Sequence, residues 1–417
     1  MPILAAVEEP KRMELSAEVF KYWVIDRRLK QVRIIMQTGE EISEPIADDD
    51  PILQSEVALS IFDWENWWIT SVTKRNNLVK AEGYNPLGED PLGGRPVVYL
   101  DQNHWRTVAQ ARINPDALRK RSEIEPALEL AYLGSDAGVV LPLSSAHFVE
   151  TAPLYGDLRY NVGIAMARLS GGWQMRHPSQ VLRHEAVRMV ARELGLQAPP
   201  TASVPVTTLE PHALLDDGVD AFLMDPADHK LFIAALTNPG LMVDLLLDPN
   251  SDPKTPVPSW VEWNQAVTDQ FATAEMSVQE KRRAAYMRVW ADHTEPLRRA
   301  LAELEREIDD LAHLTANDIP RLYDQEPMLA YLTRMYTRRY MDKNTRWKSN
   351  DLTDMTFLAC AAGYADYVAA ENHTGTQLQQ IQRSMGRPIT VHRSLEALVE
   401  QIRADGVQSA EERSSAS

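Results

Sequence analysis

The chain lacks features that mark several large classes of protein. Its 417 residues include one cysteine, Cys360, so no disulfide can form within the chain. No apolar run approaches the roughly 20 residues that a membrane-spanning helix needs. The first residues, MPILAAVEEPKR, do not resemble a secretory signal, because acids follow a short apolar piece. We therefore expect a cytoplasmic protein with no membrane partner, in which Cys360 is a small buried hydrophobe.

The marks of several enzyme classes are missing as well. The sequence has no P-loop, no glycine pattern of dinucleotide-binding domains, no H-E-x-x-H and no paired C-x-x-C. Acidic residues outnumber basic residues by 60 to 43, and the formal net charge is −17. This charge argues against a protein that coats nucleic acid through bulk electrostatics. It is compatible with an enzyme that has a local basic groove.

Hydrophobic periodicity divides the chain into parts of different character. Strands alternate with helices near both ends, which predicts a parallel sheet. A long helical stretch lies between these two parts and reads as an insertion. The expected parts are a mixed N-terminal extension (1–94), two α/β parts (95–195 and 346–404), a helical insertion (196–345) and a disordered tail (405–417).

Two smaller patterns give specific expectations about helices. Trp64, Trp67 and Trp68 have the i, i+3, i+4 spacing of one helix face, which favours a core or domain interface over a ligand site. The stretch 295–314, EPLRRALAELEREIDDLAHL, reads as one amphipathic helix with a solvated charged face.

Acidic residues stand at the places where a parallel sheet gathers its functional groups. Asp101 directly follows the apolar run VVYL, which reads as a buried strand. Glu150 lies in a helix after a second buried strand, Asp354 opens a later helix, and Glu371 ends the strand-like stretch YADYVAAE. Strand ends and the following helix starts share one edge of such a sheet, so these four residues are expected to meet there.

Four neighbouring carboxylates repel one another and need a counter-charge. Mg²⁺ or Mn²⁺ is the usual solution, and such an ion suits the hydrolysis of phosphodiesters. Asp101 has an alternative reading as the cap of the following helix. The site prediction therefore depends on all four acids occurring in this order.

The same stretches resemble the successive motifs of PIN-domain ribonucleases. VVYLDQN matches the Asp at the end of the first strand, with Asn103 as the polar residue two positions later. LSSAHFVET supplies the second acid, Glu150, and NDLTDMTFLACAAG matches the third motif, in which small residues follow Asp354. The closing Thr-x-Asp of that family is replaced by Ala370, Glu371 and Asn372.

The resemblance implies a three-layer α/β/α PIN-like domain with a parallel sheet. It covers roughly residues 95–160 and 345–403, so this chain resembles a large member with a helical insertion. It further implies that Asp101, Glu150, Asp354 and Glu371 bind one or two Mg²⁺ or Mn²⁺ ions. Asn103 would orient water or a carboxylate. The altered closing motif affects the expected binding of a second ion more than that of the first.

Three residues near these motifs have competing readings. Asp351 and Asp366 are candidate metal ligands, but they also suit the start of a helix and the turn before a strand. His147 stands one turn before Glu150, and H-x-x-E can chelate a metal on a helix face. We favour a packed or hydrogen-bonded histidine at this position.

The segment 333–348, TRMYTRRYMDKNTRWK, is the expected RNA contact. It mixes cations for phosphates with aromatic rings for stacking and leads directly into the Asp354 helix. The alternative is a basic helix face that pairs with the protein's many acids. The candidate RNA-binding residues are Arg338, Arg339, Lys343, Arg346, Trp347 and Lys348.

Together these patterns predict a metal-dependent endoribonuclease, with a toxin or phage-defence effector as the role suggested by size and analogy. A regulatory protein partner or a homo-oligomer is a further expectation. Two alternatives stay open: a catalytically weak PIN-like module that binds protein, and a structure-specific DNA nuclease.

Overall fold

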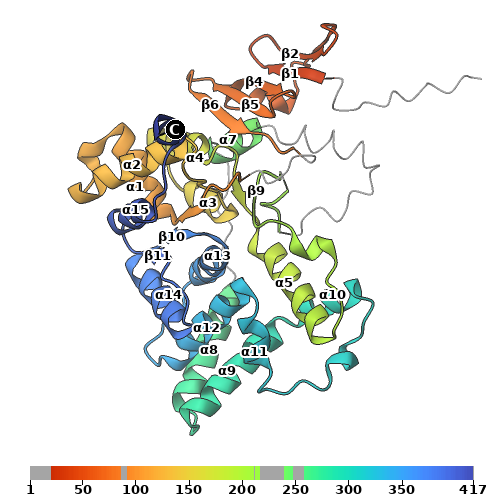
Figure 1. The fold of residues 1–417 in the computed structure, drawn as a ribbon, viewed down its shortest axis with the longest axis vertical. Helices are drawn as coiled ribbons and strands as arrows, with labels where there is room; N and C mark the ends of the chain where they lie inside the picture. The colour runs from red at the N-terminus through yellow and green to blue at the C-terminus, as the bar shows by residue number, and fades with distance from the viewer. Residues whose placement is uncertain (1–19, 86–91, 211, 217–238, 248–257, 417) are drawn as a thin grey trace, which may run out of the picture.

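The computed structural model describes residues 20–85, 92–210, 212–216, 239–247 and 258–416. Over these ranges the chain forms a six-stranded antiparallel sheet at its N-terminal end, a small parallel sheet and many helices (Figure 1). The prediction of a three-layer α/β/α domain built on a parallel sheet is therefore wrong. Most of the pairing between strands is antiparallel and lies in the segment that the sequence presented only as a mixed extension.

The N-terminal sheet has the strand order β3-β2-β1-β4-β5-β6, with every neighbouring pair antiparallel. Asp26 ends one strand because its carboxylate accepts hydrogen bonds from the backbone N–H of Arg28 and Leu29 (both 3.0 Å), which fixes a tight turn. The strands are β1 (Phe20–Asp26), β2 (Gln31–Met36), β3 (Glu41–Pro45), β4 (Val57–Asp63), β5 (Trp68–Thr73) and β6 (Leu78–Glu82).

The three tryptophans do not share a helix face, contrary to the prediction. Trp64 and Trp67 lie in the turn between β4 and β5, whereas Trp68 begins β5 and is exposed. The carboxylate of Asp63 accepts from the backbone N–H of Glu65 (3.0 Å), and this Asx turn reverses the chain where the spacing alone favoured a helix.

Helices α4 (Gly156–Ser170) and α7 (Pro239–Leu247) attach this sheet to the rest of the molecule. Arg168 on α4 donates from Nε to the carbonyl oxygen of Leu78 at 2.7 Å. Asp244 on α7 accepts from the hydroxyl of Ser55 at 2.7 Å and from the backbone N–H of Glu56 at 2.9 Å. The sheet is thus hydrogen-bonded to both helices rather than separate from them.

The parallel sheet is short and lies at the centre of the molecule. Its order is β11-β10-β7, and the register pairs Leu100 with Ala369 and Ala369 with His392. On the other side of β7, the predicted second strand is extended and buried but forms only isolated bridges, at Val140 and Leu143. The strands are β7 (Val98–Leu100), β10 (Tyr367–Ala369) and β11 (Val391–His392), with β8 (Gln174–Met175) and β9 (Thr207–Thr208) forming an antiparallel pair.

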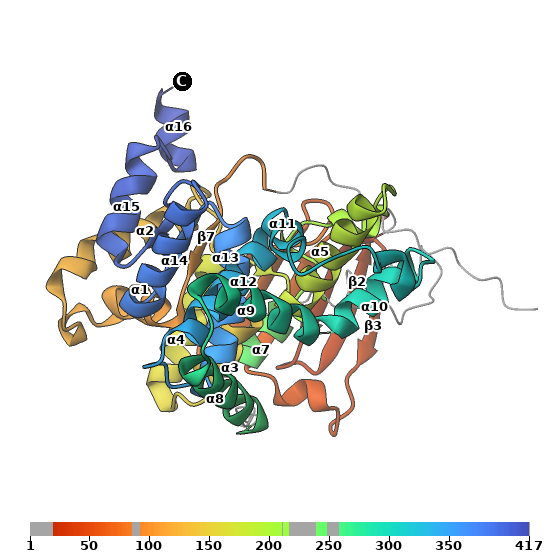
Figure 2. The same cartoon turned by 90° about the horizontal axis from the view of Figure 1, so that it is seen from below.

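Helices flank the parallel sheet on both sides. Side chains of α1, α2 and α15 pack on one face of this sheet, and side chains of α5, α13 and α14 pack on the other. Figure 2 shows α1, α2 and α15 on one side of β7 and α5 on the other. Apart from α4 and α7, the described helices are α1 (Gln102–Ile113), α2 (Ile124–Ser135), α3 (Ser145–Thr151), α5 (Pro178–Glu193), α8 (Pro258–Thr273), α9 (Val278–Asp292), α10 (Thr294–Glu303), α11 (Ile319–Asp324), α12 (Pro327–Met341), α13 (Asp351–Tyr364), α14 (Asn372–Ser384), α15 (Leu395–Ala404) and α16 (Ala410–Ala416). Short 3-10 helices are η2 (Pro51–Gln54), η3 (Pro115–Ala117), η4 (Arg121–Glu123), η5 (Pro200–Ser203) and η6 (Ile308–Leu311).

The helical middle shares a hydrophobic core with the parallel sheet. Val97 and Tyr99 lie in one buried cluster with side chains of α9 and α12, such as Tyr286 and Leu332. The predicted single helix over 295–314 is wrong, because α10 ends at Glu303 and Glu305 adopts a left-handed backbone with φ 55°. Across the described ranges, every helix is too short or too polar to cross a lipid bilayer.

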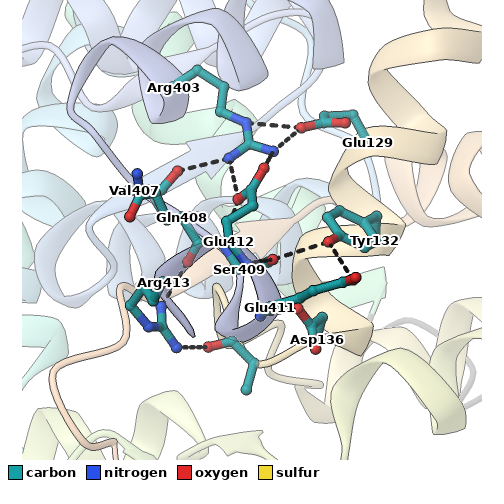
Figure 3. Close-up of polar contacts among 11 residues, drawn as sticks. Glu129, Tyr132, Asp136, Arg403, Val407, Gln408, Ser409, Glu411, Glu412 and Arg413 are labelled. Atoms are coloured by element: carbon teal, nitrogen blue, oxygen red, sulfur yellow. Dashed lines mark hydrogen bonds and ion pairs between the residues drawn. The ribbon is translucent and has the colours of Figure 1, made fainter. Parts of the chain in front are cut away.

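Residues 405–416 of the predicted disordered tail (405–417) are folded, with a helix over Ala410–Ala416. Helix α16 packs beside α2 and α15 through the polar network in Figure 3. Arg403 lies at its centre and forms ion pairs with Glu129 on α2 and Glu412 on α16. The small and polar residues of the tail suggested disorder, whereas the non-local ion pairs of Arg403 tie the segment down.

Candidate functional site

Asp101 and Glu371 lie side by side at the C-terminal ends of neighbouring parallel strands. The backbone N–H of Asp101 donates to the carbonyl oxygen of Ala369 at 2.9 Å, which continues the ladder past β7. Its Oδ1 accepts from the N–H of Gln102 at 2.7 Å, so Asp101 also caps α1, and its Oδ2 faces the N–H of Glu371 at 3.4 Å. The reading of Asp101 as the cap of α1 is therefore confirmed, and the same carboxylate stands at the end of β7.

Asn103 joins the two strand ends from the first turn of α1. Its side-chain amide donates to Oε1 of Glu371, and both side chains are exposed to solvent. The Asn103 amide thus orients the carboxylate of Glu371, which stands directly before α14.

Glu150 and Asp354 complete a cluster of four carboxylates, which come from four separate segments. Glu150 lies in the last turn of α3, and Asp354 lies in the first turn of α13. Burial and the charges of Asp101, Asp354 and Glu371 raise the pKa of Glu150 to about 8. The other three predicted acids, Asp101, Asp354 and Glu371, are thus within electrostatic reach of Glu150.

The pKa values of the other two buried acids of the cluster, Asp101 and Asp354, are raised as well. Burial, followed by the charge of Glu371, raises the pKa of Asp101 to about 6. Burial, followed by the charge of Asp101, raises the pKa of Asp354 to about 7. Like charges that lie near one another and away from water disfavour ionisation of Asp101, Glu150 and Asp354.

The cluster has no cationic side chain of its own. None of the ion pairs within the described parts of the chain involves Asp101, Glu150, Asp354 or Glu371. Arg339 lowers the pKa of Asp354, but it is paired with Asp351. An all-oxygen donor set with uncompensated negative charge fits a hard divalent cation.

The side chains do not converge on a point as they lie. Among the residues that the structure describes, no three His, Cys, Asp or Glu side chains are arranged to hold a metal ion. Protein donors engage Asp101 and Glu371 through the hydrogen bonds described above.

A buried hydrogen-bond network around His147 connects the segments that carry Asp101 and Glu150. Nε2 of His147 lies 2.8 Å from the carbonyl oxygen of Leu100, and Nδ1 of the same ring accepts from the N–H of Ser144 at 3.0 Å. Burial lowers the pKa of His147 to about 4, so the ring is neutral. The reading of His147 as a packed, hydrogen-bonded residue is confirmed, and Ser144 is the cap of α3.

Gln102 was not predicted to matter, although it borders the site. It is buried, and its amide donates to the hydroxyl of Thr151 at 2.9 Å, which ties the start of α1 to the end of α3. A polar residue that directly follows a strand-ending acid was the only available signal in the sequence.

The two additional candidate metal ligands lie elsewhere. Asp366 precedes β10 and accepts from the N–H of Val97 at 2.8 Å, so it stands at the opposite end of the strands from Asp101. Asp351 is paired with Arg339 and accepts from the N–H of Lys348 at 2.6 Å. Asp351 therefore anchors the loop before α13, and only its charge reaches Asp354.

The predicted RNA-contact segment divides into buried and exposed residues. Trp347 is buried and donates from Nε1 to the hydroxyl of Thr268 at 2.7 Å, and Arg339 lies over its ring at 4.4 Å. Neither is available for stacking or phosphate contact, because the non-local packing of α8 covers the ring. Arg338 bonds to Gln380 at 2.6 Å. The remaining cations, Lys343, Arg346 and Lys348, are exposed.

A cleft of about 800 Å³ opens beside Glu371, one of the four carboxylates. It lies between α1, the η3–η4 loop, the start of α14 and the residue after β11. Asn103 and Glu371 belong to its wall, together with four cations that the sequence analysis did not select. Those cations are Arg106, Arg119, Lys120 and Arg393. The basic run Arg119 to Arg121 is the feature of the sequence that could have indicated a cationic surface here.

Comparison with known proteins finds no matching family model, no matching curated protein and no matching solved structure.

Proposed function

We propose that this chain is a metal-dependent nuclease whose expected substrate is RNA. The observation that carries the proposal is the meeting of Asp101, Glu150, Asp354 and Glu371 without a cationic partner. These residues would hold one or two Mg²⁺ or Mn²⁺ ions. The resemblance of the motifs to PIN-domain ribonucleases supports RNA over DNA, and the cytoplasm is the expected compartment.

The chain's own residues would have distinct tasks in this reaction. Asp101 is fixed by β7 and by its capping bond, so it supplies a ligand in a defined place. Asn103 orients Glu371 through its amide. When bound, a divalent ion supplies charge neutralisation at the phosphate and lowers the pKa of a water molecule. The carboxylates confine that chemistry to the end of the parallel sheet.

The first experiment is cleavage of labelled single-stranded RNA with Mn²⁺ or Mg²⁺ and with EDTA. Wild-type protein should cleave only with the metal. Asp101→Asn and Asp354→Asn should each lower the rate by about 100-fold or more, because each removes a ligand charge. Asp366→Asn is the matched control and should cleave as the wild type does. A folded Asp101→Asn variant with wild-type activity would refute this site.

Metal binding can be measured independently of catalysis. Mn²⁺ should raise the melting temperature of the wild type in a concentration-dependent way, because it binds the folded chain alone. The rise should vanish in the Asp101→Asn variant and persist in the Asp366→Asn variant. An equal rise in all three proteins would place the ion elsewhere.

A catalytically weak module that binds protein is the second candidate. One observation favours it: the carboxylates do not converge as they lie. Absence of both metal-induced stabilisation and cleavage of RNA or DNA, by folded wild-type protein, would favour this reading. Cleavage of DNA in preference to RNA would instead point to a DNA nuclease.

A further inference from the structure

The cleft beside the carboxylates has a charge opposite to that of the chain as a whole. Four Arg or Lys side chains line it, against two carboxylates, in a protein with a net charge of −17. One of those carboxylates, Glu371, belongs to the cluster described above. The other, Glu123, is buried and accepts from the N–H of Leu395 at 2.9 Å, at the start of α15. The accessible wall is therefore cationic.

The cations of the wall are not used to neutralise acids. Within the described residues, no ion pair involves Arg106, Arg119 or Lys120, and the latter two are exposed. Arg393 makes one long contact, from Nη1 to the hydroxyl of Thr376 at 3.4 Å. Unpaired cations gathered on one concave surface of an acidic protein favour an anionic ligand.

The composition of the wall indicates which part of a polynucleotide it would contact. Within the parts of the chain that the structure describes, no Phe, Tyr or Trp lines the cleft. Single-stranded nucleic acid sites that hold bases do so mainly by stacking on aromatic rings. The rings in the wall are the imidazoles of His104 and His373, which are smaller than the aromatic rings on which bases usually stack. A wall rich in cations and poor in large rings favours contacts with phosphates over contacts with bases.

The position of the cleft connects it to the carboxylates. Asn103 and Glu371 belong both to its wall and to the end of the parallel sheet. A polynucleotide lying in the cleft would therefore contact Glu371, whose backbone N–H faces Oδ2 of Asp101 at 3.4 Å. The segment 333–348, in contrast, has lost Arg339 and Trp347 to the protein core.

We propose that this cleft binds the sugar–phosphate backbone of the substrate on one side of the cleaved bond, through Arg106, Arg119, Lys120 and Arg393 and without selecting bases. This inference rests on the proposed nuclease function. It predicts affinity that depends strongly on salt and weakly on sequence.

The test is fluorescence anisotropy of short labelled oligonucleotides with the full chain in EDTA, over a series of salt concentrations. The variant Arg119→Ala, Lys120→Ala, Arg393→Ala should bind about tenfold or more weakly at low salt, and the slope of log Kd against log salt should fall by about 2. Uridine-only and adenosine-only RNA should bind the wild type within about threefold of each other.

A control variant removes the same number of charges elsewhere. Arg282→Ala, Arg283→Ala, Arg306→Ala changes exposed cations of α9 and of the loop after α10. It should bind as the wild type does. Equal losses in both triple variants, a strong base preference, or competition by polyglutamate as effective as that by unlabelled oligonucleotide would overturn the inference.

Cleavage assays on the same proteins separate the two proposals. If the wild type binds through the cleft but cleaves nothing with Mn²⁺, the binding inference stands and the nuclease proposal fails. If the wild type cleaves and the cleft variant keeps its KM and salt dependence, the nuclease stands and the cleft inference fails.

Discussion

Nε2 of His147 donates to the carbonyl oxygen of Leu100 at 2.8 Å, directly before the acid that ends β7. The ring is buried and stacks on Tyr99, with 5.2 Å between ring centroids. Its second nitrogen accepts from the N–H of Ser144. One neutral histidine therefore fixes both the strand that carries Asp101 and the start of the helix that carries Glu150.

Replacing His147 by Phe should destabilise the protein by about 2–4 kcal/mol, because the buried N–H of Ser144 and the buried C=O of Leu100 lose their partner and the larger phenyl ring must fit the same buried site. Urea unfolding measures this change. Tyr99→Phe removes only the hydroxyl bond to Ser144 (3.0 Å) and should cost about 1 kcal/mol. A His147→Phe variant as stable as the wild type would contradict the role described.

The cost of His147→Phe should also depend on pH. Burial lowers the pKa of His147 from 6.5 to about 4, so the unfolded chain binds a proton that the folded chain does not. Wild-type stability from this residue is present above pH 6.5 and is lost as pH falls toward 4. The difference between variant and wild type should shrink over that window, by at most roughly 1.4 kcal/mol per pH unit. A difference that grows would show that the ring is protonated in the folded protein.

Glu150→Gln should stabilise the metal-free protein at alkaline pH and abolish metal-dependent cleavage. Burial raises the pKa of Glu150 from 4.5 to about 8, so ionisation costs folding free energy as pH rises through that range. Glutamine removes this cost, which solvent screening limits to about 1–2 kcal/mol. Thermal unfolding in EDTA should show a higher melting temperature above pH 8 and no gain below pH 4.5. Asp116→Asn, at an exposed acid, should show no change at either pH.

Trp347→Ala should destabilise the protein by about 3–5 kcal/mol, because it empties a buried site and leaves the hydroxyl of Thr268 without its donor. Lys343→Ala and Arg346→Ala, at exposed positions of the same segment, should stay within about 0.5 kcal/mol of the wild type. Denaturant unfolding decides between these values. Loss of RNA affinity by Trp347→Ala without loss of stability would restore the stacking role.

Arg403→Gln should lower stability by about 1–2 kcal/mol, because one guanidinium pairs with Glu129 and Glu412 and also donates to the carbonyl oxygen of Val407 at 2.9 Å. Limited proteolysis should then cut the chain near α16 sooner. Arg413→Gln is the control and should change little, since Arg413 bonds to backbone carbonyls at the exposed surface. Equal proteolysis of wild type and Arg403→Gln would show that α16 is held by other contacts.

The sequence was sufficient for features that depend on neighbouring residues. The strand before Asp101 and helix α13, with Asp354 in its first turn, lie where the pattern predicted them. Apolar runs, helical periodicity and caps are local, so they act before the tertiary structure exists.

The site shows the limit of this reasoning. Strand ends followed by acids predicted that Asp101 and Glu371 would stand near each other, and the register of β7 with β10 brings them together. The same reasoning could not place Asp366, because a residue just before a strand lies at the opposite end from one just after it. Telling these two positions apart requires the ends of β10 to be known to within one or two residues, which sequence patterns do not provide.

The sequence by itself determined the short buried strands, most helix positions and the order of the acids along the chain. Only the tertiary structure decided that residues 20–82 form an antiparallel sheet, that Trp347 and Arg339 are interior, and that Arg119, Lys120 and Arg393 face one cleft. The physical reason is that strand pairing, burial and the pairing of charges depend on residues far apart in the chain, whose proximity no local pattern encodes.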